Sequence, residues 1–295
     1  MTALRPRRSV LYMPGSNTKV LDKAKTLGVD AVILDLEDAV APDQKVTARQ
    51  NVKLAVEAGG FGHREVFVRM NGLETPWGAQ DLEMASEAGP DVLLVPKVNR
   101  PEDIFEIGHR LDAIGTSPNV KIWVMMETPR AILNASAIAG AVESPAGRRL
   151  AGFVMGTNDL AKETRARIVP GRLPMLSWLS TAIAAARAHG LEIVDGVYND
   201  FANEAGFEQE CLEGRDLGMD GKTLIHPKQA DICNRVFSPS DAEVETARKI
   251  IAAFAAPENA GKGAISLDGR MVELLHAEMS KRVVAIADAI AAQGT

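Results

Sequence analysis

Short runs of apolar residues recur along the chain and alternate with segments of helical periodicity. Several helical segments end in glycine, a frequent signal at helix C-termini. Apolar strands separated by helices indicate right-handed βαβ units and a parallel sheet. Eight such runs, the strand number of a closed barrel, lie at residues 7–13, 30–36, 65–70, 91–97, 121–126, 150–156, 191–197 and 221–226. We therefore predict an α/β protein with a (β/α)8 TIM barrel.

A doubly wound open sheet is the alternative fold for the same alternation of strands and helices. The first run is not followed by GxGxxG, so a Rossmann-type cofactor site loses its main support.

The last 65 residues or so lie beyond the eighth run and are not needed to close a barrel. Residues 241–259 and 273–293 have helical periodicity, and a glycine-punctuated extended segment, 261–273, separates them. We expect residues 1–230 to form the catalytic barrel and 231–295 to form a helical extension. This extension is either a lid or a solvated connector, and periodicity favours neither.

Composition narrows the classes of function. Lys and Arg total 33 against 39 Asp and Glu, a formal charge of -6, and no basic stripe suggests a nucleic-acid partner. Apolar runs fall short of the roughly 20 residues that span a bilayer, and the N-terminal SVLYMPG is too short for a signal sequence, so we predict a cytoplasmic protein. Aromatic residues make up 4%, which favours a small polar substrate. Cys211 and Cys233 have no metal-ligand spacing and are expected to be idle thiols.

Two acidic residues, Glu127 and Asp159, each follow a short apolar run. Strands buried on both faces point such carboxylates into the barrel mouth, where side chains from several strands converge. Mg²⁺ is usually held by one or two carboxylates, with water and substrate oxygens completing its coordination. We therefore predict a Mg²⁺ site whose substrate provides oxygen ligands.

Other strand ends carry further candidate groups. Arg69 after the third run could hold a substrate carboxylate or a thioester carbonyl, or it could form a salt bridge to an acid of the rim. The second run ends with Asp35, Glu37 and Asp38, which need cationic or metal partners if they are buried. Glu37 and Asp38 could orient Arg69 or metal-bound water, or cap the next helix. We favour such a supporting role over direct binding of the metal.

Residues 14–16 lead into a helix start, whose N–H groups can receive a phosphate or carboxylate, although most such starts bind nothing. Lys97 and Lys222 also lie at strand ends, where a Schiff-base lysine is conceivable, but the acidic pair favours a metal mechanism. His226 could be a base, but a structural histidine at a turn is the better expectation.

Several long motifs lie in one register along the chain, namely RSVLYMPGSNTKVLDKA, DAVILDLEDAV, VRMNG, LLVPKV, METPRAILNA, MGTNDLAKE, DGVYNDF, GMDGKTLIHP and DGRMVE. Together they resemble the citrate lyase beta-subunit-like (HpcH/HpaI aldolase/citrate lyase) family, which includes malyl-CoA and citramalyl-CoA lyases. The resemblance runs from about residue 7 to the final helix, and its finer features, MGTNDLAKE and VDGVYN, are similar to the (3S)-malyl-CoA thioesterase branch.

This resemblance implies Mg²⁺-dependent barrels that assemble as homotrimers or homohexamers, with the C-terminal segment covering the active site of a neighbour. Glu127 and Asp159 match the metal-binding acids, and Arg69 matches the arginine that polarises the thioester carbonyl and steadies the enolate. The implied substrate-binding amides lie near Gly156, Thr157 and Asn158, and the implied coenzyme A contacts are Pro14, Gly15 and Ser16, with Tyr12 and Lys19 as weaker candidates.

The chain departs from the family at one catalytic position. The lyases end a G-x-M-[IV]-D motif of the lid with a catalytic aspartate, whereas this chain reads GRMVE and has Glu273 there. One extra methylene moves a carboxylate by about 1.5 Å, and a misplacement of that order can cost about 10²-fold in rate. Glu273 could position a water for thioester hydrolysis instead of serving carbon–carbon cleavage, and Asp268 is its rival in the same segment.

Three functions follow from these residues. We expect first a Mg²⁺-dependent lyase that splits a malyl-CoA or citramalyl-CoA type of 3-hydroxyacyl-CoA into a 2-oxoacid and an acyl-CoA. Arg69, Glu273, Glu37 and Asp38 would be its catalytic residues. The alternative is a (3S)-malyl-CoA thioesterase, and the third possibility is a coenzyme-A-thioester-binding protein without turnover. Free coenzyme A thioesters are the expected partners, and the sequence does not select the acyl group or choose between trimer and hexamer.

Overall fold

The computed structural model describes residues 4–293, and within them the chain forms two compact units. The larger unit spans Arg7–Asn234 and contains the barrel, and the smaller unit combines residues 4–6 with 235–293. The expected boundary after residue 230 lies four residues before this division.

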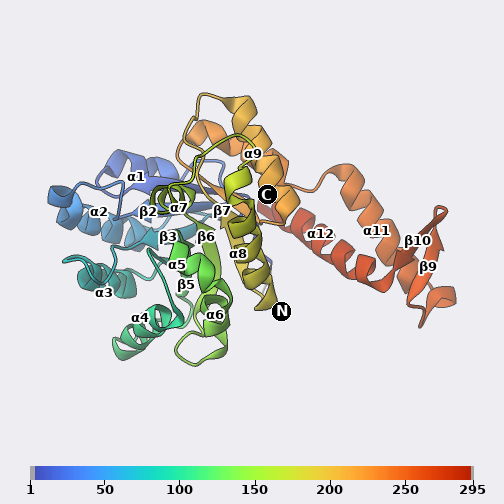
Figure 1. Cartoon of the computed structure of the whole chain (residues 1–295), viewed down its shortest axis with the longest axis horizontal. Helices are drawn as coiled ribbons and strands as arrows, with labels where there is room; N and C mark the ends of the chain where they lie inside the picture. The colour runs from blue at the N-terminus through green and yellow to red at the C-terminus, as the bar shows by residue number, and fades with distance from the viewer. Residues whose placement is uncertain (1–3, 294–295) are drawn as a thin grey trace. The chain divides into compact units, whose positions relative to one another are not determined.

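The predicted barrel is confirmed (Figure 1). Eight strands close into one sheet in their sequence order, and every neighbouring pair is parallel. The strands are β1 (Ser9–Pro14), β2 (Ala31–Asp35), β3 (Glu65–Arg69), β4 (Val92–Val95), β5 (Lys121–Met126), β6 (Leu150–Met155), β7 (Glu192–Asp195) and β8 (Gly221–Leu224).

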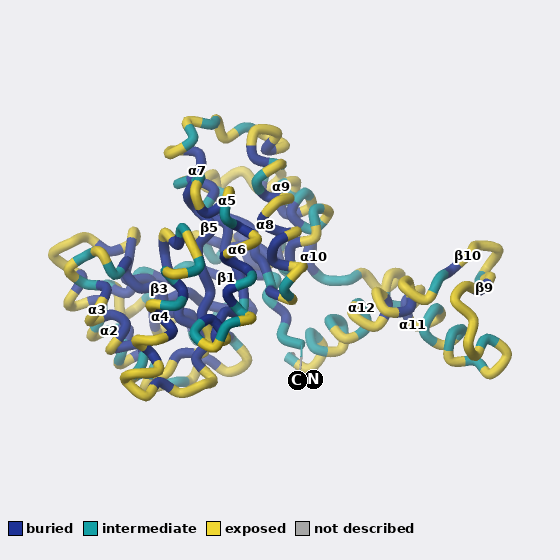
Figure 2. The backbone as a smooth tube through the Cα atoms, turned by 60° about the horizontal axis from the view of Figure 1, so that its bottom comes forward, coloured by how far each residue is buried: buried dark blue, intermediate teal, exposed yellow. Residues whose placement is uncertain are grey.

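Helices surround the strands, so that the tube through the barrel is buried at its centre and exposed along the outer helices (Figure 2). The α-helices of this unit are α1 (Thr18–Ala24), α2 (Lys45–Ala58), α3 (Gly78–Ala88), α4 (Pro101–Ala113), α5 (Pro129–Leu133), α6 (Ala135–Gly140), α7 (Thr157–Thr164), α8 (Leu176–Ala188), α9 (Glu204–Leu217) and α10 (Ala230–Phe237), which continues past residue 234. Short 3-10 turns are η1 (Pro42–Gln44), η2 (Ala141–Glu143), η3 (Leu173–Met175) and η4 (Pro227–Gln229). Asn134 separates α5 from α6, and its side chain donates a hydrogen bond to the carbonyl of Asn99.

Alternate residues of the strands fill the barrel interior. Phe67 and Trp123 meet edge to face, with ring centroids 5.3 Å apart. A Cβ on Gly152 would approach the Trp123 ring to 2.5 Å, so only glycine leaves room for this indole. At the opposite end from the strand C-termini, the Arg7 guanidinium lies 5.2 Å from the Trp123 ring and pairs with Glu65. The interior is therefore a packed core and not a pore.

The same two-residue period sets the position of the polar groups. Asp35 comes two residues after the core residue Ile33, and Arg69 comes two residues after Phe67. Asp35 and Arg69 are also direct partners in the register of β2 and β3. The apolar layers of the barrel are thus followed by a charged layer at the C-terminal ends of the strands.

The smaller unit contains the helix, extended segment and helix that periodicity predicts. They are α11 (Asp241–Ala255), η5 (Pro257–Asn259), the antiparallel pair β9 (Ala264–Leu267) and β10 (Arg270–Glu273), and α12 (Leu274–Gln293). Ser240 and Glu243 form a capping box at the start of α11. Asp268 and Gly269 both have positive φ, as a two-residue hairpin turn requires. The helices α11 and α12 pack against each other.

Within residues 4–293, none of the helices combines the length and the apolar character needed to cross a bilayer.

Candidate active site

A cavity of about 310 Å³ opens at the C-terminal ends of the strands. It brings together eight of the candidate residues that the sequence suggests, namely Tyr12, Asp38, Arg69, Glu127, Gly156, Thr157, Asn158 and Asp159. The other lining residues are Asp35, Ala39, Met125, Met155, Val197, Asn199, Thr223 and Ile225. Loops after five or more strands therefore contribute to one cavity, as is usual at the catalytic face of this fold.

Arg69 is 7% exposed and is held from several sides. Its Nε and Nη2 donate to the two carboxylate oxygens of Asp35 at 2.7 and 2.6 Å. Its guanidinium carbon lies 4.8 Å from the ring centroid of Tyr12. Burial alone would lower the pKa of Arg69, but Asp35, Tyr12 and Glu37 raise it well above its usual value. The guanidinium is thus a fixed positive charge at the wall of the cavity.

Asp35 is fully buried and orients the turn that follows β2 as well as Arg69. Its carboxylate accepts hydrogen bonds from the backbone N–H groups of Glu37 and Ala39 at 2.9 and 3.0 Å. Sequence reasoning placed Asp35 among three neighbouring acids but did not assign it to Arg69.

Glu37 and Asp38 also contact Arg69, as expected if they orient its side chain. The distances from Nη1 are 2.9 Å to Glu37 and 3.6 Å to Asp38. The Oε2 atom of Glu37 is buried and, among the described residues, receives no well-aligned hydrogen bond despite this ion pair. Burial is the main cause that raises the pKa of Glu37 to about 7. The negative charges of Asp38 and Asp35 raise this pKa further, and the positive charges of Arg69 and Lys97 lower it.

Glu127 follows β5 and is 1% exposed. Its Oε1 accepts a hydrogen bond of 2.7 Å from the backbone N–H of Lys97. Burial and the nearby charge of Glu37 raise the pKa of Glu127 to about 8. Gly156 packs directly against it, because a Cβ at Gly156 would overlap with the Cβ of Glu127.

Lys97 links two of the acids. Its backbone has φ 52°, an unusual value for a residue with a side chain, and its N–H points to Glu127. Its ammonium is 44% exposed and lies 3.7 Å from Glu37. Burial lowers the pKa of Lys97, but Glu37, Glu127, Asp38 and Asp159 outweigh this and raise it. A protonated, ion-paired Lys97 is unsuited to be a Schiff-base nucleophile.

Asp159 lies in the first turn of α7, not at the tip of a strand. Within residues 4–293, the carboxylates around the cavity (Asp35, Glu37, Asp38, Glu127 and Asp159) outnumber the cations that interact with them (Arg69, Lys97 and the buried Lys45). No cluster of three or more His, Cys, Asp or Glu side chains within residues 4–293 is arranged to hold a metal by itself. The excess of hard carboxylate oxygens nevertheless fits Mg²⁺, which commonly takes one or two carboxylates and completes its coordination with water and substrate.

The predicted coenzyme A contacts are only partly at this cavity. Tyr12 lines it, whereas Pro14, Gly15, Ser16 and Lys19 are not among its lining residues. Glu273 and its rival Asp268 belong to the smaller unit, in β10 and in the hairpin turn. Their roles stay predictions.

Lys222 has a structural environment. Its ammonium is completely buried and contacts Asp195 at 3.2 Å and Glu210 at 2.7 Å. Burial lowers its pKa, but Asp195 and Glu210 more than offset this and raise it.

His226 accepts a hydrogen bond from the N–H of Lys228 and stacks on a phenylalanine, as expected for a structural histidine at a turn. Both cysteines are buried and free.

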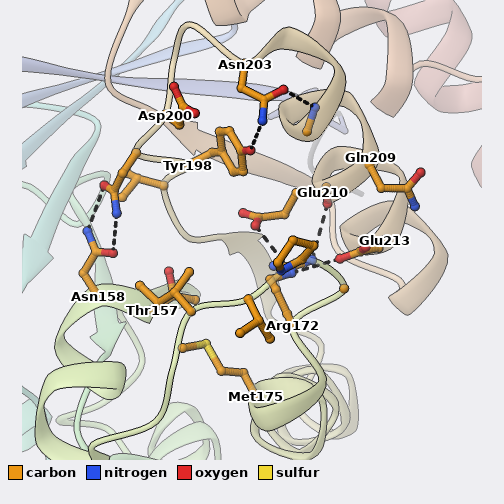
Figure 3. Close-up of a pocket in the computed structure, with 17 residues that line it drawn as sticks. Thr157, Asn158, Arg172, Met175, Tyr198, Asp200, Asn203, Gln209, Glu210 and Glu213 are labelled. Carbon is orange, nitrogen blue, oxygen red and sulfur yellow. Dashed lines mark hydrogen bonds and ion pairs between the residues drawn. The ribbon is translucent and has the colours of Figure 1, made fainter.

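A second cavity, also about 310 Å³, lies beside the first (Figure 3). It is formed by the α7–α8 connection, the β7–α9 loop and one face of α9, and it shares Thr157, Asn158, Val197 and Asn199 with the first cavity. Sequence reasoning missed it, because the cavity exists only where the α7–α8 connection, which carries none of the quoted motifs, meets α9.

Comparison with known proteins supports this description. The family model for HpcH/HpaI aldolase/citrate lyase matches residues 8–227. A (3S)-malyl-CoA thioesterase of Cereibacter sphaeroides is 50% identical over 287 residues, covering 97% of this chain and 96% of that protein. An L-malyl-CoA/beta-methylmalyl-CoA lyase of the same species is 34% identical over 312 residues, covering 98% and 96%. The crystal structure of protein CitE from Mycobacterium tuberculosis in complex with magnesium, acetoacetate and coenzyme A is similar with a TM-score of 0.74 and 27% identity, covering 96% and 99%.

Proposed function

The chain belongs to the HpcH/HpaI aldolase/citrate lyase family, whose members compared above are enzymes, and we propose that it hydrolyses (3S)-malyl-CoA or a closely related thioester. The observation that carries this proposal is the 50% identity to a thioesterase over nearly the whole length of both chains, against 34% to a lyase. Carbon–carbon cleavage, the first expectation from the sequence, thereby becomes the second candidate.

Glu127 and Asp159 would hold the Mg²⁺ ion. When bound, the ion would supply a Lewis acid for the oxygens of the acyl group and would balance the excess of carboxylates around the cavity. The magnesium and coenzyme A in the similar CitE crystal structure support both as ligands of this site.

Arg69 would serve the thioester carbonyl. Nε and Nη2 each donate to Asp35, and Nη1 pairs with Glu37 at 2.9 Å. Because a guanidinium carries five N–H groups, the second N–H of Nη1 and that of Nη2 would serve the carbonyl. A buried donor that is already oriented stabilises a developing oxyanion without reorganisation during the reaction.

The N–H groups of Thr157 and Asn158, at the start of α7, would receive the distal carboxylate of the acyl group. The N–H of Gly156 already donates to the carbonyl of Met126, so Gly156 would only bring the backbone close to the substrate.

Glu37 is the proposed general base of the barrel. A pKa of about 7 lets its carboxylate accept a proton near neutral pH. Glu37 would take a proton from water as the water oxygen bonds to the thioester carbon. The carbon–sulfur bond then breaks, and the departing thiolate takes up a proton, which leaves malate and coenzyme A. Asp38 would help to hold Arg69.

Glu273 would complete the site from a neighbouring copy in a homotrimer or homohexamer, with the smaller unit acting as a lid. The substitution of glutamate for the aspartate expected in lyases supports hydrolysis. A cytoplasmic location remains part of the same proposal.

The decisive experiment incubates the purified protein with Mg²⁺ and (3S)-malyl-CoA in water enriched in ¹⁸O. Hydrolysis yields free thiol and malate that carries one ¹⁸O in the new carboxyl group. Acetyl-CoA with glyoxylate would instead establish the lyase, and unchanged substrate would leave a binding protein. Arg69→Met should abolish turnover, whereas Arg110→Met, at an exposed position on α4, is the matched control.

A further inference from the structure

Tyr12 lines the active-site cavity from β1, although its backbone belongs to an apolar layer of the barrel. It is the register partner of Ile33, which in turn is the partner of Phe67. Its ring packs against the buried core cluster of the barrel. Packing therefore explains an aromatic ring at this position, since phenylalanine would fill nearly the same space. Packing does not explain the hydroxyl, which must find a polar partner or lose the hydrogen bonds that water gave it.

The Tyr12 hydroxyl has a weak hydrogen-bond partner. Within residues 4–293, its single hydrogen bond is donated to the Sδ atom of Met125 at 3.6 Å. A thioether sulfur is a weak acceptor. The chain's other tyrosine, Tyr198, has a better partner, because its hydroxyl accepts a hydrogen bond from Nδ2 of Asn203 at 3.2 Å (Figure 3). The hydroxyl proton of Tyr12 is thus available to a stronger acceptor that enters the cavity.

Tyr12 lies beside the group proposed for the thioester carbonyl. The guanidinium carbon of Arg69 is 4.8 Å from the centroid of the tyrosine ring. Arg69 already donates to Asp35 from Nε and Nη2, and its Nη1 pairs with Glu37. A second donor at the carbonyl would therefore add to what Arg69 can offer. Because an oxyanion is stabilised by several oriented donors acting together, the adjacent hydroxyl has a chemical use here.

The surroundings of Tyr12 keep its hydroxyl protonated. Burial is the main cause that raises the pKa of Tyr12, and the charge of Arg69 lowers it by less. The charges of three carboxylates raise this pKa further, namely those of Asp35, Glu127 and Glu37. The phenol is therefore a neutral hydrogen-bond donor near neutral pH and not a base. Such a donor can bind a carbonyl oxygen and can keep its proton when negative charge develops there.

We propose that Tyr12 is a second oxyanion donor, whose hydroxyl binds the thioester carbonyl oxygen together with Arg69. This inference rests on the proposed function and adds a catalytic residue to it. As the water oxygen bonds to the thioester carbon, the electron pair of the C=O π bond moves to the carbonyl oxygen, and the hydrogen bond from Tyr12 strengthens. The C=O bond re-forms as the carbon–sulfur bond breaks, and Tyr12 retains its proton throughout. This role differs from the coenzyme A contact expected of Tyr12 from the sequence.

Tyr12→Phe removes the hydroxyl and keeps the ring beside Arg69. With (3S)-malyl-CoA and Mg²⁺, we expect kcat to fall about 100-fold and KM to stay within about threefold, because the donor acts mainly in the transition state. Tyr198→Phe is the matched control, since it makes the same chemical change outside the active-site cavity, and it should leave kcat nearly unchanged. A fall of kcat by less than about tenfold in Tyr12→Phe would overturn the proposal. A higher KM with unchanged kcat would identify a coenzyme A contact instead.

Infrared spectroscopy measures the hydrogen bond without turnover. The probe is an analogue of (3S)-malyl-CoA that lacks the 3-hydroxyl and has a CH₂ group in place of the thioester sulfur. It can be neither hydrolysed nor cleaved, and its ¹³C-labelled ketone stands in for the thioester carbonyl. Because a hydrogen bond lowers the stretching frequency of a carbonyl, the bound ketone should absorb at lower frequency in the wild type and in Tyr198→Phe than in Tyr12→Phe. Equal frequencies in the three proteins would refute the assignment.

A second variant keeps the proposal testable if Tyr12→Phe folds poorly. Because the chain has two tyrosines, producing Tyr198→Phe with 3-fluorotyrosine places the fluorinated ring at position 12 alone. Fluorine makes the phenol a stronger donor, so the bound ketone should absorb at a still lower frequency than in unlabelled Tyr198→Phe. An unchanged frequency would contradict a hydrogen bond from Tyr12.

Failure of the inference can be distinguished from failure of the proposed function. Hydrolysis at similar rates by the wild type and by Tyr12→Phe would overturn the inference alone. If the wild type hydrolyses no (3S)-malyl-CoA but the ketone frequency depends on the Tyr12 hydroxyl, the proposed function alone is wrong. A wild type that neither hydrolyses the thioester nor binds the ketone would overturn both.

Discussion

The buried ion pair between Asp35 and Arg69 should destabilise the fold when one partner is removed but much less when both are. Asp35 is fully buried, Arg69 is 7% exposed, and two hydrogen bonds of 2.7 and 2.6 Å join them. Removing one member of such a pair costs about 3–5 kcal/mol, because a buried charge loses its partner. Replacing both with neutral side chains of similar size removes both charges, so no buried charge is left without a partner.

Asp35→Asn should therefore cost about 3 kcal/mol, at the low end of this range, because Glu37 remains 2.9 Å from Nη1 of Arg69. Arg69→Met should cost a similar amount, since Asp35 keeps only its two backbone donors. Independent losses would sum to about 6 kcal/mol. We expect the double variant to lose no more than about 3 kcal/mol, and all three variants to lose turnover.

Urea unfolding at 25 °C, followed by circular dichroism, measures the free energies of unfolding. Each single variant should also melt roughly 6–12 °C below the wild type. A double variant whose loss equals the sum of the single losses would refute mutual stabilisation. A loss below about 1 kcal/mol in Asp35→Asn would show that Asp35 does not carry the charge assigned to it.

Three further outcomes are expected. Without Mg²⁺, the melting temperature should fall as pH rises from about 4.5 to 8. Folding raises the pKa of Glu37 to about 7 and that of Glu127 to about 8, so the folded state binds more protons and loses stability as they dissociate. A melting temperature that rises in this pH window would contradict these pKa shifts. Gly156→Ala should weaken Mg²⁺ binding by roughly tenfold or more in calorimetry, because the new methyl group displaces Glu127. Lys97→Gly should be about 1 kcal/mol more stable than Lys97→Ala in urea unfolding, because glycine adopts φ 52° without strain. Both variants lose the contact to Glu37, so this contact does not affect the comparison. Equal stabilities would exclude strain at this residue.

The strand pattern was readable from the sequence because strands covered on both faces are apolar along their whole length. The charged residues at strand ends are predictable for a related reason, since Arg69 interrupts such a run and Glu127 follows one. Asp35 could have been assigned by counting in twos from Ile33, which places it on the inward face beside Arg69.

Other features depend on packing between distant segments. The left-handed backbone of Lys97 follows from no local signal, because lysine has no preference for positive φ. The second cavity depends on how the α7–α8 connection meets α9, and the Lys222 network joins residues from β7, β8 and α9. Periodicity reports which face of an element is buried but not which partner buries it.

The two-residue period that aligns Asp35 with Arg69 also limits how this enzyme can diversify. Inserting or deleting one residue within β2 or β3 would turn the charged side chains toward the helices and apolar ones toward the mouth. New substrate preferences are therefore expected to arise from changes of length and composition in the loops. A mutagenesis library for altered specificity should accordingly hold the strands constant and vary residues 165–175 and 197–203.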